Sequence, residues 1–225
     1  MSKARSTQRA DGEATRRRIL EAAGALIAMH GFAQTTNKMV AAEAGADMAS
    51  INYHFGNRNG LYQATLIEAH RRIIDRADIE RIATAAIPAR DKLRGLIAFF
   101  LASASGEDRW PVIVLFRELV APSAHIAALR DVEVAPKLMM VLPILSEITG
   151  IPVGTPDLWL CLPCIGAPCL ALLLIGRNLP FGGFALALPR DEQVERLYTF
   201  AIGGLEAVGE NYRRKGSGET TADLQ

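Results

Sequence analysis

Residues 39 to 55, MVAAEAGADMASINYHF, decide the fold expected for this chain. They predict a helix, a turn and a second helix. Two helices that cross closely need a small residue on the first, a residue that tolerates positive φ in the turn, and an apolar side chain on the second. Ala41, Gly45 and Ile51 occupy these three positions. The pattern indicates a helix-turn-helix, although an ordinary helical hairpin would satisfy the same positions.

The second of these helices carries side chains suited to reading DNA. In a helix-turn-helix the second helix lies in the major groove, and its N-terminal residues face the base edges. The residues in that position are Met48, Ala49 and Ser50, with Asn52 nearby. The side chains suited to phosphate oxygens at its far end are Tyr53, His54 and Arg58.

Helical spacing continues on both sides of this stretch. Apolar residues recur from Ile19 to His30, with Gly31 as a C-cap. Short helices are expected at 37–44, after the N-cap residues Thr35 and Thr36, and at 48–55, and a longer helix from Leu61 into the low 80s. Further helices are expected at 91–105, 110–120, 123–149 with a break near Pro136, 157–177 and 191–214.

The chain is therefore expected to be all-α. No stretch alternates apolar and polar residues over the length of a strand. The expected fold is an N-terminal three-helix helix-turn-helix domain followed by a larger helical domain. The expected boundaries are a flexible basic arm at 1–12, the helix-turn-helix domain at 13–60, the larger domain at 61–214 and a disordered tail at 215–225.

Composition and charge narrow the possible partners. Half of the 225 residues are hydrophobic and the formal charge is only +1, which excludes a disordered chain and a uniformly charged one. The charges are unevenly placed: residues 1–72 carry 10 basic and 6 acidic side chains, whereas residues 73–225 carry 15 and 18. A basic N-terminal third favours an anionic partner, either nucleic acid or a membrane surface.

Residues 15 to 61 resemble the DNA-binding domain of the tetracycline-repressor (TetR) family of bacterial transcriptional regulators. The resemblance rests on the RRRIL opening, the HGF turn, the TT cap, AAEAG, and NYHFGNR before GLY. It implies a homodimer that binds a palindromic double-stranded DNA operator and is released by a small-molecule effector held in the larger domain. It also implies that Thr36, Asn37 and Lys38 contact the DNA backbone, that Ser50 and Asn52 approach bases, and that Tyr53, His54 and Arg58 hold phosphates. Arg58 stands where a lysine is commoner in the family.

The larger domain resembles the CecR-type branch of the family at FRELVAPS (116–123) and SEITGIP (146–152). Pro163 and Pro168 depart from it, because they fall inside an expected helix. The residues expected to line an effector site, or otherwise to belong to the core, are Phe99, Phe100, Trp110, Phe116, Arg117 and Trp159. If Arg117 and Glu118 are buried, each must pair with a neighbour or a ligand.

The last two helices are expected to form the dimer. The first contains 19 residues without a charge, Leu158 to Gly176, and the second carries an apolar stripe with small residues that permit close approach. The residues expected at the interface are Cys169, Leu172, Leu197, Ala201, Gly204, Leu205 and Val208. The uncharged segment is long enough for a membrane span, but its two prolines and its isolation favour a buried helix and no membrane contact.

The remaining reactive side chains favour neither a metal site nor an enzyme. The three cysteines, Cys161, Cys164 and Cys169, are expected to be small buried residues and not a metal site, since no histidine lies near them in sequence. No catalytic residues, metal or cofactor are expected, and a helical small-molecule binding protein or enzyme with a structural N-terminal hairpin is the alternative. With no apolar segment after its basic N-terminus, the protein is expected in the cytoplasm.

Overall fold

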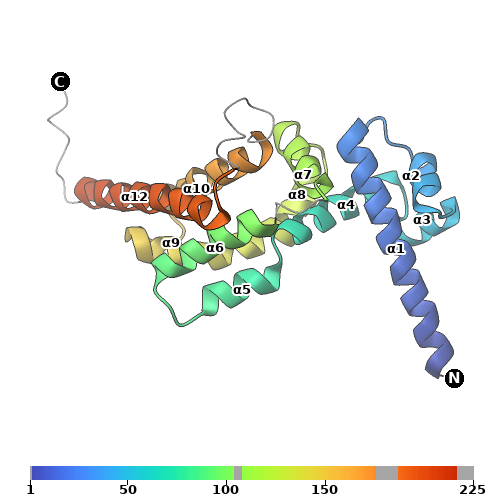
Figure 1. Ribbon diagram of the computed structural model, residues 1–225, viewed down its shortest axis with the longest axis horizontal. Helices are drawn as coiled ribbons and strands as arrows, with labels where there is room; N and C mark the ends of the chain where they lie inside the picture. The colour runs from blue at the N-terminus through green and yellow to red at the C-terminus, as the bar shows by residue number, and fades with distance from the viewer. Residues whose placement is uncertain (1, 104–107, 176–186, 217–225) are drawn as a thin grey trace. The chain divides into compact units, whose positions relative to one another are not determined.

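The protein is all-α, as the sequence predicts. The computed structural model describes residues 2–103, 108–175 and 187–216, and within these ranges every regular element is a helix (Figure 1). The expected tail lies outside the described residues from 217 onward, whereas residues 215 and 216 belong to the last helix. The chain folds into two compact units: residues 1–73 with 107–135, and residues 74–106 with 136–225.

The first unit combines the helix-turn-helix with a later part of the chain. Its helices are α1 (Ser2–His30), α2 (Asn37–Ala44), α3 (Met48–Phe55), α4 (Arg58–Ile73), α7 (Trp110–Val120), α8 (Ile126–Leu129) and the π-helical turn η1 (Arg130–Val134). α1 packs against α2, α4 and α7, and α4 packs against α7. The expected boundary after residue 60 falls inside α4, and α7 packs with the helices that precede residue 73.

The ends of α2 and α3 lie where the sequence predicts them. Thr36 caps α2 by accepting a hydrogen bond from the Met39 backbone N–H at 3.2 Å, and Gly45 ends the helix in the left-handed region at φ 56°. Asp47 caps α3 by accepting a hydrogen bond from the Ser50 N–H at 2.6 Å. The turn between the helices therefore uses one glycine, Gly45, and one side-chain cap, Asp47.

Several expected boundaries differ from the structure. α1 begins at Ser2, so a helix occupies the region where a flexible arm was expected. α4 begins at Arg58 instead of Leu61 and ends at Ile73, and a separate helix α5 (Arg76–Thr84) follows, capped by Asp75. The expected break near Pro136 is absent, since η1 runs directly into α9 (Ala135–Thr149).

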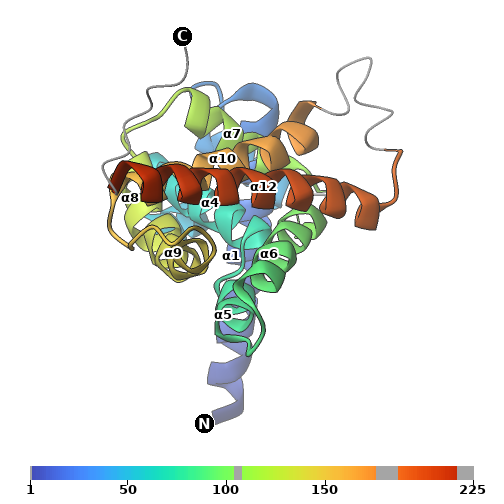
Figure 2. The same cartoon turned by 90° about the vertical axis from the view of Figure 1, so that its left-hand side faces the viewer.

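The second unit is a set of longer helices. α6 (Ala89–Ser103) packs against α5 and against α12 (Arg190–Gly216), and α10 (Pro156–Ile175) packs against α6 and α12 (Figure 2). α10 remains one helix across Pro163 and Pro168. No helix within the described residues is long and apolar enough to cross a membrane, although the 19-residue uncharged segment extends one residue beyond them.

Candidate nucleic-acid interface

α3 is an eight-residue helix with four exposed residues. Of its eight residues only Ile51 is buried, where it joins the core that α1, α2 and α4 build. Met48, Ala49, Asn52 and Tyr53 are exposed, and the Tyr53 side chain is 85% exposed. Phe55 is half-buried and packs against the same core, so two apolar side chains hold α3 and its exposed residues are available to a partner.

The start of α3 is fixed by Asp47. Its carboxylate is fully exposed, and the hydrogen bonds from Ser50 hold its pKa below the ordinary value for aspartate. Because the N-terminal residues of a recognition helix face the bases, this cap orients the part of α3 predicted to read sequence. An aspartate directly before a helix is a signal that sequence reasoning could have used and missed.

The first unit carries exposed basic side chains on the helices that pack with α3. Arg17 and Arg18 of α1 and Lys38 of α2 are exposed. Arg16 lies over the Phe55 ring, with its guanidinium carbon 5.6 Å from the ring centroid. His54 is half-buried beside α1 and Tyr53. The arginine and lysine side chains carry positive charge, which attracts the negatively charged phosphate oxygens of DNA.

Arg58 occupies a different position from the one expected for a phosphate contact. Its Nε donates to the carbonyl oxygen of Thr35 at 3.0 Å, and its Nη2 donates to the carbonyl oxygens of Ala33, at 2.9 Å, and of Phe32. Its guanidinium carbon lies 4.4 Å from the centroid of the Phe32 ring. The side chain is half-buried and ties the turn between α1 and α2 to the start of α4.

A buried carboxylate lies behind this turn. The Phe32 ring stacks on Tyr62 with the ring centroids 4.0 Å apart, and the Tyr62 hydroxyl donates to Glu118 at 2.7 Å. Glu118 is 1% exposed and also accepts from the backbone N–H and the hydroxyl of Ser123, at 2.9 and 2.7 Å. The expectation that a buried Glu118 must pair is confirmed, whereas Arg117 is exposed.

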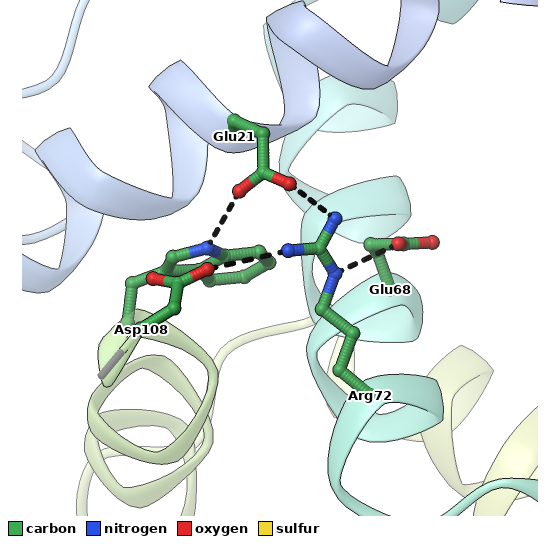
Figure 3. A network of polar contacts seen from close by, with 5 residues as sticks. Glu21, Glu68, Arg72 and Asp108 are labelled. Atoms are coloured by element: carbon green, nitrogen blue, oxygen red, sulfur yellow. Dashed lines mark hydrogen bonds and ion pairs between the residues drawn. The ribbon is translucent and has the colours of Figure 1, made fainter. Parts of the chain in front are cut away.

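Arg72 joins α1, α4 and α7 in the same unit (Figure 3). Its guanidinium contacts Glu21 at 2.5 Å, Glu68 at 2.9 Å and Asp108 at 3.4 Å, and it lies 5.1 Å from the centroid of the Trp110 ring. Trp110 donates to Glu21 at 3.0 Å. Partial burial opposes ionisation of Glu21, but hydrogen bonds from Arg72 and Trp110 outweigh it and lower its pKa.

Comparison with known proteins identifies the helix-turn-helix. Residues 19–65 match the family of bacterial regulatory proteins described as the tetR family. These residues form a TetR-family N-terminal domain. The match begins in α1 and ends in α4, so it contains α2, α3 and both side-chain caps. No curated protein matches the chain.

Solved structures share the fold over most of the chain. A TetR family transcription regulator from Marinobacter aquaeolei VT8 is 19% identical, with a TM-score of 0.65 over 87% of this chain and 97% of that one. The ketosteroid transcriptional regulator KstR2 of Mycobacterium tuberculosis is 18% identical, with a TM-score of 0.61 over 84% and 93%. The fatty acid degradation regulator FadR from Bacillus halodurans is 19% identical, with a TM-score of 0.61 over 84% and 98%. The chain thus shares the fold of these transcription regulators, and none of these matches is described as belonging to the CecR-type branch.

The six residues expected at an effector site are divided between the two units. Trp110, Phe116 and Arg117 belong to α7 in the first unit, whereas Phe99, Phe100 and Trp159 belong to the second. Trp110 is buried against α1, where a Cβ built on Gly24 would lie 2.3 Å from its ring. The second unit contains an open groove of about 730 Å³ between α6 and α12, and none of the six lines it. Its lining residues are Asp91, Arg94, Gly95, Ala98, Arg190, Asp191 and Val194.

The residues expected at a dimer interface divide between core and surface. Cys169, Ala201 and Leu205 are buried by the unit's own helices, and Leu172 and Leu197 are half-buried. Gly204 and Val208 are exposed, and beside them on α12 Phe200 is 69% exposed. α10 carries a second exposed stripe at helical spacing, of which Leu160 is 66% exposed. Its residues are Leu160, Pro163, Cys164, Ala167 and Ala171.

The cysteines follow the prediction in part. Cys161 and Cys169 are buried, and burial raises the pKa of both thiols, to about 11 for Cys169. Cys164 is exposed, because it lies on the outward stripe of α10. Within the ranges that the structure describes, no group of histidine, cysteine and acidic side chains could hold a metal ion.

Proposed function

We propose that this protein is a DNA-binding transcriptional repressor that binds a palindromic operator as a homodimer and is released by a small molecule. The observation that carries the proposal is the exposed surface of α3, a helix that is held by the buried Ile51 and the half-buried Phe55 and capped by Asp47. A recognition helix needs this combination of a fixed start and exposed side chains. In this proposal the protein acts in the cytoplasm.

The proposed DNA contacts follow from exposure and position. Asn52 and Ser50 approach base edges, with Met48 and Ala49 beside them, because they lie on the first two turns of α3. The proposed backbone contacts come from the start of α2 and the end of α3, namely Thr36, Asn37, Lys38, Tyr53 and His54. Arg58 is left out of this group because its donors bind backbone carbonyls.

The proposed dimer uses the exposed stripes of α10 and α12. At about 100° per residue, Phe200, Gly204 and Val208 share one side of α12. The buried Ala201 and Leu205 lie on another side, and exposed Glu206 and Glu210 on a third. Since α10 and α12 pack against each other, a second copy of the chain could cover both stripes as a four-helix bundle. Two recognition helices could then enter successive major grooves.

The proposed effector is an apolar or amphipathic small molecule bound in the second unit. Two proteins of similar fold are named for ketosteroids and for fatty acid degradation, which makes those two classes the first to test. Leu158 and Cys161, which are buried on α10, are apolar side chains of the kind that such molecules contact.

The test is selection of bound fragments from genomic DNA by the full chain, followed by salt titration and a ligand screen. We expect recovered fragments to share a palindromic sequence. With roughly 6 to 10 phosphate contacts per dimer, the affinity should fall by on the order of 10³ to 10⁵ between 50 and 200 mM salt. Asn52→Ala should change the preferred bases, whereas Lys38→Gln should weaken all sequences about equally. Binding that is indifferent to salt would contradict the proposal.

A further inference from the structure

One side chain from α4, that of Arg58, binds the backbone carbonyls of the turn between α1 and α2. Three carbonyl oxygens of this turn, from Phe32, Ala33 and Thr35, accept hydrogen bonds from the guanidinium of Arg58. The turn follows the C-terminus of α1, where the helix dipole and unpaired carbonyls favour a cation. The ring of Phe32 is itself stacked on Tyr62, so the guanidinium contacts a part of the turn that the core already fixes.

We propose that Arg58 is a positioning residue for DNA binding, which sets the start of α2 through the turn and makes no phosphate contact. The inference rests on the proposed function. Thr36, which caps α2, follows Thr35 directly, so the carbonyl that Arg58 holds is adjacent to the cap. α2 then leads through Gly45 to α3. A loosened turn therefore displaces the start of α2 and, through it, the recognition helix.

Arginine is required for this role by geometry. A guanidinium is planar and offers five N–H donors in a fixed fork, and it stacks on aromatic rings. A lysine ammonium keeps the charge but is a compact group on a flexible stem. A phosphate contact depends mainly on charge. Simultaneous contact with three carbonyl oxygens and a ring face depends on the planar fork of donors. Arg58→Lys therefore separates the two roles.

The experiment compares Arg58→Lys, Arg58→Gln and the matched control Lys38→Gln, which changes a side chain at the start of α2. Each is titrated against the selected genomic fragment and against a random-sequence duplex of equal length, at several salt concentrations and well below its unfolding temperature. Hydrogen exchange of the backbone amides is followed over residues 32–36. Phe32→Leu removes the stacked ring without changing charge. It therefore loosens the same turn while Arg58 itself is unchanged.

The proposal predicts that Arg58→Lys and Arg58→Gln lose similar affinity for the selected fragment, on the order of tenfold or more, since each removes several charge-assisted hydrogen bonds. The loss should be smaller on random DNA, the wild-type salt slope should persist, and exchange should accelerate at 32–36. Phe32→Leu should change affinity and exchange in the same direction. Lys38→Gln should instead lower the slope by about 2 per dimer, near 0.9 for each phosphate that is no longer neutralised.

Two results would overturn the inference. If Arg58 contacts phosphate, Arg58→Lys will bind like the wild type and Arg58→Gln will lose salt slope as Lys38→Gln does. If Arg58 serves stability alone, both variants will unfold at lower temperature but bind normally while folded. Wild-type protein that binds no DNA would overturn the proposed function itself, which distinguishes that failure from either of these.

Discussion

The Tyr62 hydroxyl donates a hydrogen bond to Glu118 across 2.7 Å, and the two residues are 56 positions apart in the chain. The glutamate is 1% exposed, so bulk solvent does not reach it to replace a missing donor. Tyr62→Phe should therefore lower the free energy of unfolding by about 1–3 kcal/mol, the usual cost of a buried acceptor left short of a partner. Urea denaturation measures the change. Tyr53→Phe, on the exposed face of α3, is the matched control and should leave stability unaltered.

The same pair predicts a loss of stability in alkali. Burial, followed by the hydrogen bond and charge of Glu118, raises the pKa of Tyr62 well above the tyrosine value of about 10. Above pH 10 the unfolded chain releases the phenol proton while the folded chain retains it, so stability should fall as pH rises. Subtracting the profile of Tyr62→Phe from that of the wild type isolates this contribution. A flat difference between pH 9 and 11, in a protein that remains folded, would contradict it.

A side chain at position 24 is expected to lower stability, because the Trp110 ring occupies the space that it would need. A Cβ at this position would lie 2.3 Å from the indole ring, and that ring is fixed by its hydrogen bond to Glu21. Gly24→Ala should destabilise the first unit by about 1–3 kcal/mol, the range for overpacked cores. Thermal unfolding provides the measurement. Combining it with Trp110→Leu should cost less than the sum of the two single changes, because the smaller side chain removes the clash.

Phe200→Arg should separate the proposed dimer without unfolding the chain. Phe200 is largely exposed within a single chain, so a charge there disturbs only a surface that a second copy would cover. Sedimentation should show monomers, and operator affinity should fall with them. Glu210→Arg, on the charged side of α12, should remain dimeric. Leu205→Arg should instead unfold the second unit, since Leu205 is buried by its own helices. A Phe200→Arg variant that stays a dimer would place the interface elsewhere.

The elements that sequence predicted best are those with local chemical signals. Residues 37–44 and 48–55 are bounded by cap residues and glycines, which act within a few positions. The start of α4 was predicted three residues late although its signal is also local: the Asn57 side chain accepts from the Gly60 N–H at 2.9 Å. The helix over residues 2–12 escaped prediction because it has no periodic apolar stripe.

The sequence predicted which residues of α3 are exposed but not which groups Arg58 contacts. Exposure of Asn52 and Tyr53 follows from the helical position of Ile51, since one buried residue fixes the orientation of a short helix. The role of Arg58 could not be read, because its acceptors lie 23 to 26 residues earlier and depend on how α4 packs against the turn. For the same reason the residues expected at the interface did not include Phe200 and Leu160, which are exposed in the structure. Sequence identified the apolar helices, but only packing shows which apolar side faces inward.

The π-helical turn at Arg130–Val134 makes this segment a natural site of length variation between related proteins. A π turn holds one residue more per hydrogen-bonded ring than an α turn, so removal of a single residue here would leave a continuous helix. The buried Glu133, however, pairs with Arg71 at 2.6 Å. A deletion between Arg130 and Glu133 would shorten the spacing between α8 and that carboxylate by one residue and so change the position from which it reaches Arg71. A relative that lacks the extra residue should therefore also lack this ion pair, and the two features should be inherited together or disappear together.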